Sequence, residues 1–259
     1  MLNRYSKGLT VEENRRAVEI LHTLEIPANC CFIMFDPFTT VQELRETIGF
    51  IRNSGAHLLG MRPYNLLNSL LVIKGTPMYD RLKDTDLLIP YGKMLYNYRF
   101  LDSKVETIYK AVSVIDGMIS PMDIRFRKVL PRYTALVNAL SQALGMKQEA
   151  VRSIPELRWG FMESYIRWHN GLPPLVLDIL DSVTSLVDCL DPRHGDNVYI
   201  LRVAIADKMN DWLRKCFGAQ GPYAQFGALT SLLDSPILSL SIPCKGVQTY
   251  DNPIYRTIG

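Results

Sequence analysis

One short pattern, Thr-Val-x-Glu, occurs twice in the first fifty residues, and it constrains the local structure more than any other feature. Thr10 with Glu13, and thirty residues later Thr40 with Glu43, have the spacing of a capping box. In that motif the threonine hydroxyl accepts a hydrogen bond from the amide three residues on, and the glutamate bonds back to the threonine amide. The pattern therefore predicts two helices that begin at these threonines.

Each predicted helix also has an apolar face, because apolar residues recur at intervals of three and four. Pro27 closes the first helix, and Gly55 is placed to act as the C-cap of the second. The apolar positions are Ala17, Ile20, Leu21 and Leu24 in the first helix, and Val41, Leu44, Ile48 and Ile51 in the second.

Short apolar runs follow the predicted helices, at Cys31 to Phe35 and at Leu58 to Leu67. Helix and strand in alternation at this spacing are typical of βα units with parallel strands, which are covered on both faces and so read as continuous apolar runs. We therefore predict an α/β N-terminal part, a partial TIM-like barrel of parallel strands with helices, followed by a mainly α-helical region. In such folds the carboxyl ends of the strands carry the functional residues, which directs attention to Asp36.

Three segments in this order resemble the later part of the barrel of radical S-adenosylmethionine (SAM) enzymes, in particular those that also bind cobalamin. They are "KGLTVEENRRAVEIL", "FIMFDPFTTVQELRETIGFI" and "IKGTPMYDRL", and the resemblance extends from Leu2 to Leu82. Pro37 and Thr40 match the proline and threonine of the family's fifth-strand motif, whereas Phe35 replaces its usual glycine. Phe38 and Thr39 replace its Gly-Glu pair. In the later turn Gly75, Thr76 and Pro77 match, and Lys74 replaces the usual proline.

The resemblance implies that the end of the fifth strand contacts the adenine of SAM, largely through backbone and apolar groups. The residues to which it assigns this cofactor contact are Ile33, Phe35, Asp36 and Pro37. Arg62, Tyr64 and Asn65 stand near the end of the next apolar run, where a barrel enzyme places substrate contacts. They form a possible substrate rim; the alternative is that Arg62 pairs with Asp36 or another carboxylate.

The chain lacks the cluster motif that defines the family's chemistry. A [4Fe-4S] cluster needs thiolate ligands, which the family supplies from Cys-x3-Cys-x2-Cys. The five cysteines here are two neighbours, Cys30 and Cys31, and three distant ones, Cys189, Cys216 and Cys244. His22 and His57 are too isolated to complete a metal site. We therefore predict no metal site and no cofactor bound by this chain alone, although the family uses SAM, a [4Fe-4S] cluster and, in some members, cobalamin.

Three explanations fit a chain that resembles only the later part of such a barrel. They are a truncated gene product, a split enzyme whose cluster-binding half is a second chain, and a remnant with a new role. The first two predict the C-terminal portion of a radical SAM enzyme, contributing the SAM adenine-side wall and a helical substrate or partner region, and inactive without the cluster-binding half. The alternative function is a cluster-free helper subunit that binds a partner enzyme or a substrate peptide.

Beyond Ile89 the sequence is mostly helical in pattern, and we predict three parts: a partial barrel at 1–88, a helical domain at 89–217 and a loosely structured tail at 218–259. Ser103 with Glu106 has capping-box spacing, and the Pro173-Pro174 pair predicts a break between helices. The apolar stripe after Ser103 consists of Val105, Ile108, Val112, Ile115 and Ile119.

Charge and hydropathy exclude some classes of partner. A net charge of +3 is too small to indicate binding to nucleic acid or to an anionic membrane surface. No apolar run reaches the ~18 residues that a membrane span needs, and the first ten residues have no apolar signal core. We therefore expect a cytoplasmic protein with neither nucleic acid nor membrane as a partner.

Overall fold

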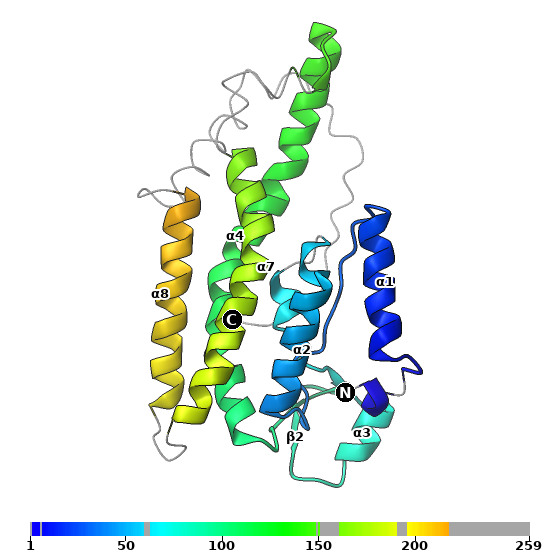
Figure 1. Ribbon diagram of the computed structural model, residues 1–259, viewed down its shortest axis with the longest axis vertical. Coiled ribbons are helices and arrows are strands. Elements are labelled where there is room, and N and C mark those ends of the chain that lie inside the picture. The colour runs from blue at the N-terminus through cyan, green and yellow to red at the C-terminus, as the bar shows by residue number, and fades with distance from the viewer. Residues whose placement is uncertain are drawn as a thin grey trace.

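The computed structural model describes residues 2–5, 7–59, 63–148, 150, 161–190 and 196–217. Most of them are helical, and five long helices run roughly along the long axis of the molecule, with a small sheet and α3 at one end (Figure 1). The helices are η1 Leu2–Tyr5, α1 Val11–Thr23, α2 Val41–Ser54, η2 Ala56–Leu58, η3 Pro63–Leu66, α3 Pro77–Leu82, α4 Ser103–Leu144, α7 Phe161–Leu186, η4 Val187–Cys189 and α8 Asn197–Phe217, and the strands are β1 Val72–Ile73, β2 Leu88–Pro90 and β3 Leu95–Tyr98.

The two predicted threonine capping boxes are confirmed. The Thr10 hydroxyl accepts from the Glu13 amide, and the Glu13 carboxylate accepts from the Thr10 amide, at the start of α1. Thr40 and Glu43 make the same reciprocal pair at the start of α2. Gly55 ends α2 with a left-handed backbone at φ 72°, which glycine adopts without a Cβ penalty.

The prediction of a partial barrel with parallel strands is wrong. The described residues form one three-stranded sheet in the order β1-β3-β2, and both of its pairings are antiparallel. The run Cys31 to Phe35 is not a strand: Phe35 makes one isolated parallel bridge, to Ser69. The second predicted strand, Leu58 to Leu67, contains the short helix η3 and residues outside the described set.

The physical reason lies in what an apolar run can and cannot indicate. Burial favours any apolar segment, but a parallel strand also needs a continuous ladder of backbone partners. The described backbone bonds in and beside the two runs are few: Ala28 donates to Leu59, Met34 and Phe35 both donate to Asn68, and Leu70 donates to Phe35. The buried residues of the runs, among them Met34, Phe35 and Leu66, therefore pack in a cluster formed largely by helices, in place of a sheet.

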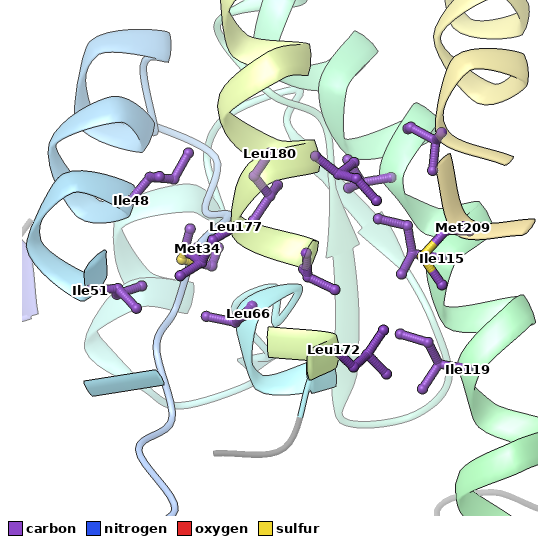
Figure 2. Close-up of a cluster of buried hydrophobic side chains, with 14 of the residues drawn as sticks. Met34, Ile48, Ile51, Leu66, Ile115, Ile119, Leu172, Leu177, Leu180 and Met209 are labelled. Atoms are coloured by element: carbon purple, nitrogen blue, oxygen red, sulfur yellow. The ribbon is translucent and has the colours of Figure 1, made fainter. Parts of the chain in front are cut away.

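The described residues contain two apolar clusters, and Figure 2 shows part of the larger one in close-up. Helix α7 lies between α2 on one side and α4 with α8 on the other (Figure 2). Leu177 and Leu180 of α7 face Ile48 of α2 in this view. The cluster includes residues from Val18 to Cys216, so it joins the segments 1–88 and 89–217; the predicted tail at 218–259 lies outside the described residues.

Helix α4 begins one residue earlier than the Ser103 capping box predicts. Its N-cap is Asp102, whose carboxylate accepts from the amides of Lys104 and Val105 at 2.9 and 3.4 Å. A carboxylate placed here also interacts favourably with the positive end of the helix dipole. The predicted apolar stripe of α4 is buried as expected.

The predicted break at Pro173-Pro174 is wrong, because both prolines lie inside α7. Proline removes an amide donor and usually breaks or kinks a helix. Here the surrounding apolar residues are fully buried in the core, and this packing outweighs the local preference: Leu172, Val176 and Leu177 flank the pair. Within the described residues, no helix has an apolar stretch of the length that a bilayer requires.

Candidate functional site

The candidate site is centred on Asp36, a fully buried carboxylate at the end of the apolar run. Arg4 donates from Nη1 to both of its oxygens, at 2.8 and 2.6 Å. The Tyr5 hydroxyl donates to Oδ2 at 2.5 Å, and the amide of Phe38 donates to Oδ1 at 2.7 Å. A buried carboxylate is tolerated only when it is paired and hydrogen-bonded, and Asp36 meets both conditions.

The local sequence explains why the chain turns at this point. Pro37 cannot donate a backbone hydrogen bond, and aspartate readily bonds the amide two residues on, as Asp36 does to Phe38. The Thr39 hydroxyl accepts from the Asp36 amide at 2.9 Å, and the Thr39 amide donates to the Asp36 carbonyl at 3.1 Å. This closed turn leads directly into the Thr40 cap of α2, so the position of Asp36 is fixed relative to the helix.

Arg4 also binds Glu43 in the first turn of α2. Its Nη2 donates to the two carboxylate oxygens at 2.7 and 3.0 Å. Burial alone would raise the pKa of Glu43, but the hydrogen bonds from Arg4 and from the Thr40 amide outweigh it and hold that pKa below its ordinary value. Burial opposes the charge of Arg4 in the same way, and the bonds to Glu43 and Asp36 nevertheless raise its pKa. Both groups are therefore ionised at neutral pH.

Tyr5 completes the cluster from the same short helix, η1. Burial raises the pKa of its hydroxyl, and the hydrogen bond to Asp36 raises it further. The hydroxyl therefore remains a donor to the carboxylate over the whole physiological pH range. Arg4 and Tyr5 together cover the Asp36 carboxylate, so this group is not available as a metal ligand or a general base while η1 is in place.

Aromatic residues fill the other side of the turn. The ring of Phe35 is fully buried and lies edge-on to Phe100 and Tyr109, with centroids 6.4 and 5.2 Å apart. The Tyr98 hydroxyl donates to the Phe35 carbonyl at 2.9 Å and accepts from the Leu70 amide at 3.1 Å. The phenylalanine that replaces the glycine of the resembled motif therefore packs in the core against α4.

The next aromatic residue, Phe38, lies between two guanidinium groups. Arg4 is 5.7 Å and Arg81 5.1 Å from the centre of its ring. These distances suit cation–π attraction, which is worth about 0.5–1 kcal/mol at a partly exposed site. Phe38 thereby links the Asp36 turn to α3, where Arg81 is exposed.

The remaining residues of the implied cofactor contact differ in accessibility. Ile33 is half-buried, whereas Pro37 is buried and its carbonyl accepts from the Leu101 amide at 2.9 Å. Ile33, Phe35, Asp36 and Pro37 are thus parts of one segment; Ile33 is half-buried and the other three are buried.

The three possible substrate-rim residues are not brought together around Asp36. Asn65 is buried, and its side-chain amide donates to the Asn29 side chain at 2.6 Å. Asn29 precedes the apolar run Cys31 to Phe35, whereas Asp36 follows it. Arg62 and the side chain of Tyr64 lie outside the described residues. The cation that pairs with Asp36 is Arg4, which sequence reasoning missed; its 32-residue separation from Asp36 gives no local signal.

The cysteines and histidines do not converge. Among the described residues, no group of three or more potential ligands could hold a metal ion. Cys30 is half-buried, and burial together with the neighbouring Cys31 raises the pKa of its thiol. His22 and His57 each bond a backbone carbonyl, of Gly55 and Ile51 respectively, at 3.1 Å.

No family of known proteins, no curated protein and no solved structure matches this chain. The site itself is a satisfied ion-pair cluster at the base of α2. Its ion pairs and hydrogen bonds have a structural role: they fix the turn at Asp36 and attach η1 to the start of α2.

Proposed function

We propose that this chain is the C-terminal portion of a radical SAM enzyme of the cobalamin-binding kind, inactive without a cluster-binding half. The observation that carries the proposal is the order and spacing of three motifs between Leu2 and Leu82. The position of the Asp36 turn supports it: the turn follows an apolar run and precedes a capped helix, as in the resembled motif, although the run itself is not a strand. One parallel bridge, from Phe35 to Ser69, joins the end of the apolar run Cys31 to Phe35 to the residues just after the next apolar run, Leu58 to Leu67.

The residues present limit what this chain would contribute. They do not fit a [4Fe-4S] cluster, because the sequence contains no Cys-x3-Cys-x2-Cys to supply its thiolate ligands. In the resembled family, reductive cleavage of SAM supplies a 5′-deoxyadenosyl radical. Arg4 and Tyr5 cover the Asp36 carboxylate, so a contact to adenine from this segment would be apolar, with Ile33 as its most accessible side chain.

Anaerobic iron-sulfur reconstitution followed by a SAM-cleavage assay tests the proposal. The isolated chain should neither retain four irons nor release 5′-deoxyadenosine. Co-expression with the product of the DNA just upstream should restore both, and that DNA should encode Cys-x3-Cys-x2-Cys. Four-iron loading and SAM cleavage by the isolated chain would refute the predicted inactivity. An upstream stop codon and an unrelated gene would refute the proposed origin.

The second candidate function is a cluster-free helper that binds a partner enzyme. The observation that favours it is the exposure of Ile20 in α1 and of Leu24 at its C-cap, although both belong to the predicted apolar face. The buried state of Phe35, Asp36 and Pro37 points the same way, because these side chains offer no surface to a cofactor. The two functions separate in the co-expression assay: a helper should change the activity of an enzyme that cleaves SAM without it.

A further inference from the structure

The groups that surround the Arg4 guanidinium form a site that fits the shape of this cation. Its Nη1 donates to both oxygens of Asp36 at 2.8 and 2.6 Å, and its Nη2 donates to both oxygens of Glu43 at 2.7 and 3.0 Å. The Phe38 carbonyl lies 3.5 Å from the same Nη2, and the centre of the Phe38 ring lies 5.7 Å from the guanidinium carbon. A planar fork of donors beside two carboxylates and an aromatic ring is typical of arginine recognition, and a lysine ammonium does not match it.

Both carboxylates are held in place by hydrogen bonds that do not involve the guanidinium. The Asp36 carboxylate accepts from the Phe38 amide at 2.7 Å, and the Asp36 amide donates to the Thr39 hydroxyl at 2.9 Å. The Glu43 carboxylate accepts from the Thr40 amide at 3.2 Å, as part of the capping box of α2. These bonds lie within the turn and the first turn of the helix, so the site should keep its shape without η1. Such a preorganised site binds a ligand at a low conformational cost.

The hydrogen bonds that join the short helix η1 to the rest of the described chain all come from two side chains, those of Arg4 and Tyr5. Tyr5 also packs beside the smaller apolar cluster of β1 and α3. Residues 7–10, which lead into α1, are all exposed. Gly8 has a left-handed backbone at φ 64°, and nothing lies within 4 Å of the position that a Cβ would take. Because a few exposed residues between two elements can absorb large changes in φ and ψ, this connection can act as a hinge.

We propose that η1 occupies, within its own chain, a binding site for an arginine side chain, and that an arginine of a partner polypeptide replaces it. The Tyr5 hydroxyl, which also donates to Asp36 at 2.5 Å, points to a partner segment in which a tyrosine follows the arginine. When η1 moves away, Asp36 and Glu43 present two negative charges. Arg81, 5.1 Å from the centre of the Phe38 ring, supplies one positive charge nearby, so the site still attracts a cation. This binding role does not depend on the radical SAM function.

The attachment of η1 to the same chain sets how strongly a partner must bind. A ligand joined to its site by a short flexible connection acts at an effective concentration on the order of millimolar. A partner arginine therefore competes with Arg4, and it binds the intact chain more weakly than a chain whose site is empty. In this way η1 forms an autoinhibitory contact, and removal of its two binding side chains should strengthen partner binding by at least about tenfold.

Isothermal titration calorimetry of the full chain with short peptides tests this role. The double variant R4A/Y5A has an empty site, and it should bind a peptide with the sequence of residues 2–8 at least about tenfold more tightly than the wild type does. The same peptide with lysine in place of arginine should bind at least about tenfold more weakly, because a compact ammonium does not reproduce the planar fork of donors. Free arginine, which lacks the neighbouring tyrosine, should also bind more weakly than the peptide.

A matched pair of carboxylate variants locates the binding. In the R4A/Y5A background, Asp36→Asn should abolish binding of the peptide, because the site loses its buried negative charge. Glu12→Gln, which removes an exposed carboxylate of α1, should leave the affinity unchanged. Circular dichroism checks that each variant folds.

The wild type provides a measurement that needs no variant. Peptide at a concentration on the order of millimolar should displace η1, and nuclear magnetic resonance should then show faster exchange of the Arg4 guanidinium hydrogens with water. The lysine peptide should have no such effect. Unchanged exchange in the wild type, or a folded R4A/Y5A variant that binds both peptides equally or binds neither, would overturn the proposal. Free arginine that binds as tightly as the peptide would overturn the assignment to a polypeptide partner.

Discussion

At the scale of single residues, the Arg4 guanidinium decides whether Asp36 can remain buried. Among the described residues, it supplies two of the four hydrogen bonds that the carboxylate accepts and the positive charge that pairs with it. Breaking a buried ion pair costs more than forming it gains, because the remaining charge keeps its desolvation penalty. Arg4 is therefore a structural residue in spite of its place near the start of the sequence.

We expect Arg4→Met to lower the free energy of unfolding by about 3 kcal/mol, because Asp36 is left buried and charged without its cation. Urea unfolding measures the change. The control is Arg15→Met, which removes only an exposed pair with Glu12 and should cost less than about 1 kcal/mol. Equal small losses in the two variants would contradict the structural role of Arg4.

A second residue-scale prediction compares two glycines of the same helix region. Gly55→Ala should lower the free energy of unfolding by about 1 kcal/mol, because alanine is strained at φ 72° and its Cβ would lie 3.0 Å from His22 Nε2. Gly49→Ala, inside α2 with nothing within 4 Å of the added Cβ, should raise it by about 1 kcal/mol. Urea unfolding of both variants tests the opposite signs.

At the scale of elements, Asp188 ties three of them together. Its carboxylate, in η4, accepts from Lys104 of α4 at 2.7 Å and from Arg45 of α2. These hydrogen bonds lower its pKa from 3.8 to about 2. A carboxylate with a lowered folded-state pKa stabilises the fold above its ordinary pKa, and loses that contribution as pH falls toward the folded-state value.

The pH dependence follows from this sign. The difference in stability between the wild type and Asp188→Asn should be constant above about pH 5 and should shrink as pH falls toward about 2. Thermal unfolding of both proteins across this range measures it. A difference that grows on acidification would contradict the assignment, and high salt should reduce it at every pH because the pair is exposed.

At the scale of the whole molecule, the larger apolar cluster, which contains residues of both chain segments, predicts cooperative unfolding. Leu177 of α7 is buried in the cluster that also contains Ile48 of α2. Leu177→Ala should cost about 2–5 kcal/mol and lower the stability of both chain segments together. Tryptophan fluorescence reports on the later segment, since all three tryptophans follow residue 158, and hydrogen exchange of α2 amides reports on the earlier one. Separate transitions would show two independent units.

The sequence is a good guide to local structure and a poor guide to long-range pairing. Threonine caps, the Gly55 C-cap and the stripe of α4 depend on neighbouring residues, and all are as predicted. The apolar run before Asp36 wrongly predicts a parallel strand, because its pattern does not distinguish a ladder from packing against helices. Pro173-Pro174 wrongly predicts a break, because core burial on both sides of the pair cannot be read from the local sequence.

The candidate site shows the same division. The turn at Asp36 and its position before α2 follow from the local motif, but its partners Arg4 and Tyr5 do not. The ion pair between Arg4 and Asp36 joins residues 32 positions apart. It depends on the folded arrangement, and no local sequence pattern predicts it. The small antiparallel sheet is also missing from the prediction, since its strands have two to four residues and no long alternation.

The packing of α2 against α7 has a consequence for synthesis on the ribosome. Arg52 bonds Asp178, which is made 126 residues later. At a translation rate of roughly 5–20 residues per second, the ribosome takes about 6–25 seconds to synthesise the residues between Arg52 and Asp178. During that time Ile48 and Ile51, which are buried in the folded protein, lack the contacts that α7 later supplies, so the partly made chain exposes apolar surface.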